Sequence, residues 1–144
     1  MCYALFIGTD IELDVPDVEV AVYADAFHLE TLQDEHHIVL PHFSKPFVYY
    51  AASWQGCGCG WFKDSLLLAL PKKRRRSNER TAADLRSLVG LLGDLGTSEL
   101  FLSWEGELDG GVLRRLELAP GDFEADSIPL EQGDFVVVRA AGPS

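Results

Sequence analysis

The residues best suited to chemistry in this chain are its three cysteines, two of which form a Cys-x-Cys pair flanked by glycines. The pair is Cys57 and Cys59, and Cys2 begins the first apolar segment of the chain. Thiolates bind zinc at about 2.3 Å, and a histidine can complete a closed structural site. If the strands that carry the cysteines are neighbours, three sulfurs converge, and His42 is the favoured fourth ligand. A zinc site is therefore one hypothesis.

The spacing of the cysteines leaves two other interpretations open. Recognised zinc spacings place two residues between paired cysteines, whereas here Gly58 stands alone between them. The cysteines can instead be small buried hydrophobic side chains packed among glycines. Alternatively, Cys57 or Cys59 is the reactive thiol of an enzyme, with its pKa lowered by its surroundings. A thiol-dependent enzyme therefore stands beside the zinc site as an alternative.

All four histidines fall between residues 28 and 42. After His42, the next candidate zinc ligands are His36 and His37. No His-Glu-x-x-His motif of a catalytic zinc site is present. Clustered histidines without such a motif are usually surface residues, so the cluster alone predicts no metal centre.

Charge is distributed in blocks along the chain. The formal net charge is −11, and residues 1–44 contain nine acidic residues and no Lys or Arg. The run Lys72–Arg76, followed by Arg80, is basic, and we interpret residues 71–80 as an exposed loop. A chain this acidic repels nucleic-acid phosphates and anionic membranes. The charge therefore favours a basic protein partner and argues against nucleic-acid or membrane binding.

Hydrophobic periodicity predicts the elements that must position these residues. Short apolar runs and period-two alternation indicate strands at 2–7, 18–24, 47–54, 57–62, 100–104, 112–118 and 135–139. Residues 25–46 are expected to be mostly loop. Apolar residues at helical spacing predict one main helix at 82–95, between Thr81 as N-cap and Gly96 just past its end.

The order of these elements is strands, one helix, then strands with short connections. This order favours an α+β fold, a largely antiparallel sheet with the helix of about 82–95 packed on it. The 144 residues suit a single domain, 1–144, that can bury its own core. An odd number of cysteines argues for a reducing compartment, and neither a signal peptide nor a membrane span is expected.

Three stretches carry a resemblance to a known family. They are the opening MCYALFIGTD, the segment FSKPFVYY at 43–50 and the segment GCGCGWF at 56–62, with FEADSIPLEQGDF at 123–135 in addition. They resemble a family of uncharacterised bacterial proteins that begin with Met-Cys-Tyr and carry a Gly-Cys-Gly-Cys-Gly segment. The resemblance implies a bacterial source and a cytoplasmic location, and it implies no activity.

Taken together, these observations favour a small acidic cytoplasmic binding protein over an enzyme. Its expected partner is a basic protein. Structural zinc held by Cys2, Cys57, Cys59 and His42 is the first alternative, and a thiol-dependent enzyme is the second.

Overall fold

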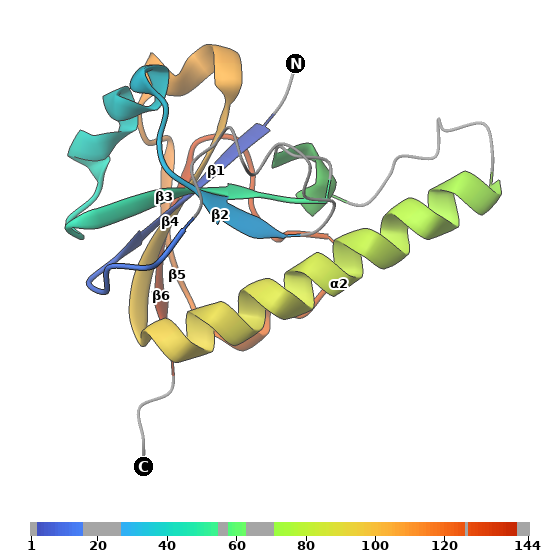
Figure 1. Cartoon of the computed structure of the whole chain (residues 1–144). Coiled ribbons are helices and arrows are strands. Elements are labelled where there is room, and N and C mark those ends of the chain that lie inside the picture. Colours follow the sequence, from blue (N-terminus) through green and yellow to red (C-terminus); the bar gives the residue numbers. More distant parts are fainter. Residues whose placement is uncertain (1–2, 16–26, 55–57, 63–70, 126, 141–144) are drawn as a thin grey trace.

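The computed structural model describes residues 3–15, 27–54, 58–62, 71–125 and 127–140, and for residues 58–59 and 71–77 it describes the backbone only. Its elements are β1 Tyr3–Thr9, β2 His28–Glu30, η1 Asp34–His42, β3 Phe47–Ala52, η2 Gly58–Trp61, α2 Pro71–Leu95, β4 Thr97–Trp104, η3 Glu105–Gly110, β5 Arg114–Leu118, η4 Pro120–Phe123 and β6 Asp134–Arg139, where η marks a 3-10 helix (Figure 1).

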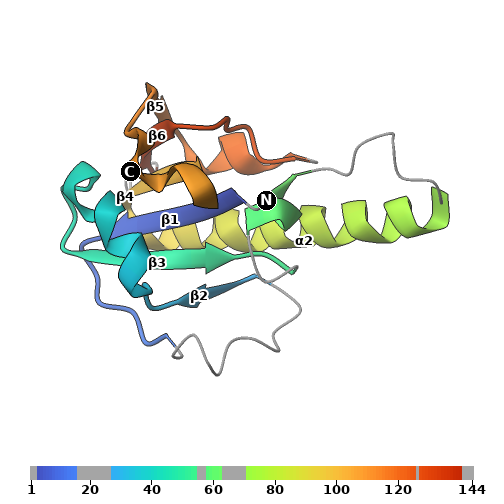
Figure 2. The ribbon, with the colours of Figure 1, turned by 90° about the horizontal axis from the view of Figure 1, so that it is seen from above.

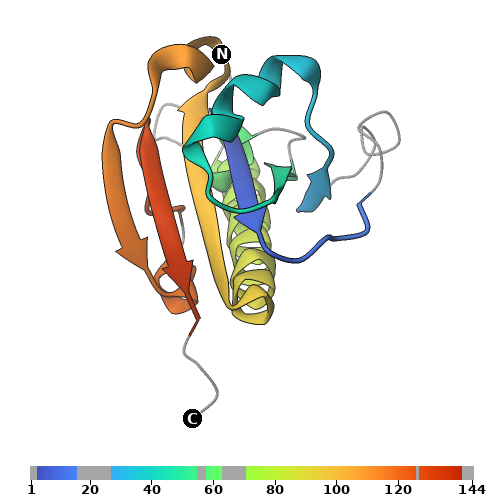
Figure 3. The same ribbon diagram turned by 90° about the vertical axis from the view of Figure 1, so that its left-hand side faces the viewer.

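The six strands form one sheet in the order β2-β3-β1-β4-β6-β5. Every neighbouring pair is antiparallel except β5 and β6, which run parallel. Strands β5, β6, β4 and β1 lie side by side in Figure 3 as the orange, red, yellow and blue arrows. The predicted α+β class, with a largely antiparallel sheet and one main helix, is confirmed.

Both faces of the central strands are covered. Leu5 and Ile7 of β1 pack in a cluster with the leucines of α2, whereas Ala4 and Phe6 point to the opposite face, against η1 and η3. Figure 2 shows α2 lying behind the sheet. Double coverage is why β1 reads as a continuous apolar run and not as an alternating one.

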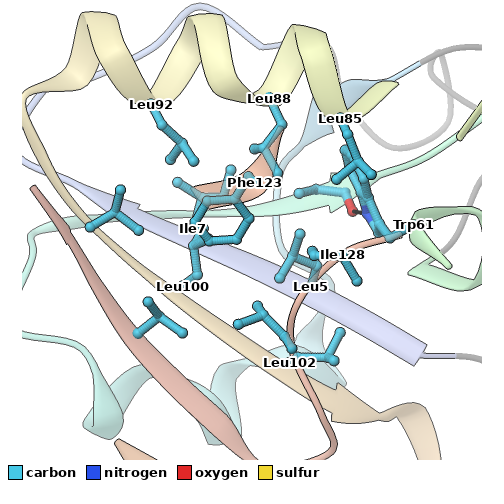
Figure 4. Close-up of a cluster of buried hydrophobic side chains, with 14 of the residues drawn as sticks. Leu5, Ile7, Trp61, Leu85, Leu88, Leu92, Leu100, Leu102, Phe123 and Ile128 are labelled. Atoms are coloured by element: carbon cyan, nitrogen blue, oxygen red, sulfur yellow. Dashed lines mark hydrogen bonds between the residues drawn. The ribbon is translucent and has the colours of Figure 1, made fainter. Parts of the chain in front are cut away.

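The α2 face holds the larger core. Leu85, Leu88 and Leu92 point from the helix towards the sheet, and each is fully buried (Figure 4). Each buried leucine contributes roughly 1.5–3 kcal/mol. The helix ends where predicted, because Gly96 adopts φ +74° just after Leu95.

The beginning of this helix differs from the prediction. Residues 71–80, interpreted as an exposed basic loop, form the first turns of α2, which begins at Pro71. Lys and Arg are good helix formers, and proline suits the first helical position. Residues 71–80 carry no apolar stripe. Figure 1 shows that the beginning of α2 extends beyond the sheet, where no apolar face is needed. The usual sequence signal of a helix is therefore missing there.

The predicted return strand at 57–62 is wrong over residues 58–61, which form η2. Gly60 lies so close to Ser53 and to the indole of Trp54 that a Cβ atom would collide with both. The carbonyl oxygen of Gly60 accepts a hydrogen bond from the Thr81 hydroxyl at 2.7 Å. These tertiary contacts favour a tight turn against α2 over an extended hairpin.

Residues 27–46 contain more regular secondary structure than predicted. Within this stretch the structure describes β2 and the 3-10 helix η1, where a loop was expected. The predicted strand at 18–24 lies outside the described residues. In the described part of the chain, no helix combines the length and apolarity needed to cross a membrane.

Candidate functional site

The structure does not test the predicted cysteine cluster. Cys2 and Cys57 lie outside the described residues, and only the backbone of Cys59 is described. Among the side chains that the structure does describe, no three His, Cys, Asp or Glu groups come together as metal ligands. The zinc site and the thiol enzyme therefore both stay predictions.

The described neighbours of the cysteines nevertheless meet. Tyr3, the residue after Cys2, has its ring 4.5 Å from the ring of Phe62, which ends the Gly-Cys segment. Tyr3 also stacks on Trp104 at 3.7 Å. The start of β1 and the end of the Gly-Cys segment thus share one aromatic cluster.

His42 lies elsewhere in the molecule. Its ring is 5.2 Å from that of Phe101, which belongs to the cluster on the η1 face of the sheet. Trp61 and Phe62 instead pack in the α2-face cluster. In Figure 1, η1 and η2 also sit at opposite ends of the sheet. The structure therefore does not bring His42 to the Gly-Cys segment.

The other histidines take different roles. His36 is buried, stacks on Tyr50 with ring centroids 5.0 Å apart, and places Nε2 3.5 Å from Glu105 Oε2. His28 lies 2.6 Å from Glu30 on β2. His37 is exposed. The expectation of surface histidines is therefore wrong for His36, whose ring is buried between η1 and the sheet.

A buried carboxylate fastens α2 to the sheet. Asp84 Oδ1 accepts the Phe27 N–H at 2.9 Å, and Oδ2 accepts the Trp54 N–H at 2.7 Å. Burial raises the pKa of Asp84 above its ordinary value of 3.8, and these two bonds partly oppose the rise. Arg80 lies 5.2 Å above the Trp54 ring. Because both oxygens are occupied by backbone donors, Asp84 acts as a structural clamp.

A second buried carboxylate shapes the turn between η1 and β3. Glu99 accepts bonds from the Ser44 N–H and hydroxyl, both at 2.8 Å, and from the Lys45 N–H at 3.1 Å. Beside it, a Cβ on Gly8 would stand 2.6 Å from the Phe43 ring. Glycine at position 8 therefore lets Phe43 close over β1, and the Glu99 carboxylate bonds the turn in place.

Pro46, which follows this turn, lines a surface groove. The groove has a volume of about 290 Å³ and lies between η1 and the beginning of β3, near the end of β2. On η1, Ile38 is 48% exposed and Leu40 is 39% exposed. The lining residues are mostly apolar: Thr31, Leu32, His37, Leu40, Pro46, Phe47, Val48 and Tyr49.

Exposed carboxylates occur in the segments that adjoin the groove lining. Leu13 donates its N–H to the hydroxyl of the lining residue Tyr49 at 2.8 Å, and its chain neighbours Glu12 and Asp14 are exposed. Exposed Asp34 and Glu35 begin η1. The basic residue nearest in sequence to the lining residues is Lys45, which precedes Pro46. Its ammonium group is 2.7 Å from the carboxylate of Asp10 and is therefore already paired. The groove lining is therefore mostly apolar, and the segments that adjoin it are acidic.

Sequence reasoning missed this groove. Its residues come from three segments, and no single motif marks them. The available signal was the absence of Lys and Arg from residues 1–44, together with the exposed apolar pair Ile38 and Leu40 on a stretch expected to be loop.

No protein-family model, curated protein or solved structure matches this chain.

Proposed function

We propose that this chain is a small binding protein, and that its groove between η1 and β3 holds a basic segment of a protein partner. The observation that carries the proposal is an apolar groove of about 290 Å³ whose adjoining segments carry exposed carboxylates. An aliphatic side chain of the partner would bury apolar area in the groove. Lysine or arginine beside it would face Glu12, Asp14, Asp34 and Glu35.

The buried acidic groups support binding over catalysis. Each buried carboxylate that the structure describes already has a partner inside the protein: Glu30 with His28, Asp84 with two backbone amides, Glu99 with Ser44 and Lys45, and Asp134 with Arg114. These hydrogen bonds account for the four carboxylates as groups that hold the fold together.

A heptapeptide of alternating lysine and valine, blocked at both ends, tests the proposal. It should bind at low ionic strength and shift the NMR signals of Thr31, Leu40 and Val48. Binding should weaken when ionic strength rises from about 0.01 M to about 0.15 M, because the screening length falls from roughly 30 Å to roughly 8 Å. The same peptide with glutamate in place of lysine should not bind.

Matched variants locate the site. Leu40→Lys puts a positive charge into the groove and should weaken peptide binding at least about tenfold, like loss of one good buried contact. Leu113→Lys changes a leucine that is 69% exposed beside β5, at the far edge of the sheet, and should leave binding unchanged. Equal effects of the two variants would mean that the groove is not the binding site.

Structural zinc is the second candidate, and the contact between Tyr3 and Phe62 favours it. That contact brings together the ends of the segments that carry Cys2 and Cys59. A reducing compartment, such as the bacterial cytoplasm that the family resemblance implies, keeps thiols available as ligands. With His42 on the other face, the fourth ligand would be another residue or a solvent molecule.

Metal analysis of protein purified without chelator decides this second candidate. We expect one zinc ion per chain and thiols that react only after the metal is removed. Protein without metal, whose thiols react only after denaturation, would mean that the cysteines pack as buried hydrophobic residues. Protein without metal but with fast-reacting native thiols would favour the thiol enzyme.

A further inference from the structure

The first three residues of β3 have a strand partner on one side only, within the part of the chain that the structure describes. Phe47, Val48 and Tyr49 pair with Thr9, Gly8 and Ile7 of β1. On the other side of β3, the ladder with β2 covers only Tyr50, Ala51 and Ala52. An edge of this kind presents backbone N–H and C=O groups that can pair with another chain.

The reason that β2 is short lies in the residues that follow it. Gln33 is the N-cap residue just before η1. Its carbonyl oxygen accepts the His36 N–H at 2.9 Å, and its own N–H donates to His36 Nδ1 at 3.3 Å. The chain therefore turns out of the sheet after Glu30. Thr31 and Leu32 become lining residues of the groove. The groove is thus the place where the missing residues of β2 would have paired.

We propose that the partner segment binds in the groove as an added strand, extended along Phe47–Tyr49 in continuation of β2. This inference depends on the groove being the binding site proposed above. Backbone pairing would supply affinity, and the alternating side chains of the segment would supply specificity.

The two sides of this edge differ in chemistry, and the difference defines the partner. Val48 and Leu32 both pack against the buried cluster on the η1 face. Successive residues of a strand point to opposite faces, so Phe47 and Tyr49 face the other way, and Tyr49 reaches Leu13 between Glu12 and Asp14. An added strand would therefore direct one set of alternate side chains towards the face of Val48 and the other set towards the face of Tyr49, which contacts the segment that carries Glu12 and Asp14. The matching sequence alternates apolar and basic residues.

Two N-methylated forms of the lysine–valine heptapeptide test the backbone pairing. One form carries methyl groups on the three valine nitrogens, and the other carries them on the nitrogens of the three lysines that follow a valine. Both have the same charge, composition and side chains. In an added strand, one set of amides faces β3 and the other faces solvent. One form should bind at least about tenfold more weakly than the parent peptide and the other should bind like it, because only one loses its hydrogen bonds to the edge.

Amide hydrogen exchange gives an independent readout. The parent peptide should slow exchange within Phe47–Tyr49, and the inactive methylated form should not. If both methylated forms bind like the parent, or both lose binding equally, strand addition is wrong, although Leu40→Lys can still show that the groove binds the peptide.

Two further outcomes would overturn the inference. Failure of the parent peptide to bind at low ionic strength would remove both strand addition and the proposed function. A free protein that is a dimer in solution, and that the parent peptide dissociates, would mean that a second copy of the chain occupies the edge in place of a separate basic partner.

Discussion

Replacing Trp61 with alanine should lower the free energy of unfolding by about 4 kcal/mol, which is the usual cost of deleting a large buried aromatic side chain. Trp61 is fully buried, and its ring meets that of Phe27 edge to face at 5.2 Å. Its indole N–H donates to the carbonyl oxygen of Ala51 at 3.2 Å. Its own carbonyl oxygen accepts the Ile128 N–H at 2.8 Å. Urea unfolding followed by circular dichroism measures the loss.

Two variants serve as controls for this result. Trp61→Phe keeps most of the buried area but leaves the Ala51 carbonyl without its donor, so we expect a loss of about 1–2 kcal/mol. Trp104→Ala removes a partly exposed tryptophan that stacks on Tyr3, and it should cost less than Trp61→Ala. If Trp61→Ala were no more costly than Trp104→Ala, η2 would not be anchored in the core by its tryptophan.

Replacing Asp84 with alanine should lower the free energy of unfolding by about 2–3 kcal/mol near neutral pH, because the backbone amides of Phe27 and Trp54 would lose their acceptors. Asp94→Ala, at an exposed position of the same helix, is the matched control and should change stability by less than about 0.5 kcal/mol. Similar losses in both variants would contradict the clamp. Urea unfolding at constant pH measures the difference.

The effect of Asp84 should also depend on pH. Burial raises the pKa of Asp84 in the folded state above 3.8, so the folded protein binds its proton more tightly than the unfolded chain. The stability that Asp84 confers is therefore greatest below pH about 3.8 and falls as pH rises through the raised pKa. The stability difference between the native protein and Asp84→Asn should shrink over that interval. A difference that grew with pH would contradict the raised pKa.

Local sequence patterns predict the elements whose burial is regular. Leu85, Leu88 and Leu92 recur at helical spacing because one face of α2 lies against the sheet, so the second half of this helix was predictable, and so was its end at Gly96. The central strands are apolar on both faces because helices cover both sides of the sheet, and they too were readable. The first half of α2 was not, since its sequence carries no apolar residues at helical spacing.

The candidate site was less predictable than the fold. The sequence indicated an acidic chain suited to a basic partner, but it did not indicate where that partner would bind. The sequence suggested His42 as a ligand beside the cysteines, but the three-dimensional arrangement places its ring against Phe101 and away from the Gly-Cys segment. His42 is the last residue of η1 and not part of a strand, so the face of the sheet that it reaches depends on where η1 packs.

The amino-acid sequence by itself determined the composition and the acidic charge. It also determined the α+β class, the principal strands and the main helix, because these follow from local hydrophobic periodicity. The tertiary structure decided the conformation of η2, the clamps at Asp84 and Glu99, and the groove beside η1. Each of these depends on contacts between segments distant in the chain. The groove exists because β2 ends at Glu30, opposite Tyr50, whereas β3 extends three residues further along the sheet, over Phe47–Tyr49. This difference in length between two paired strands is not a property of either sequence segment alone.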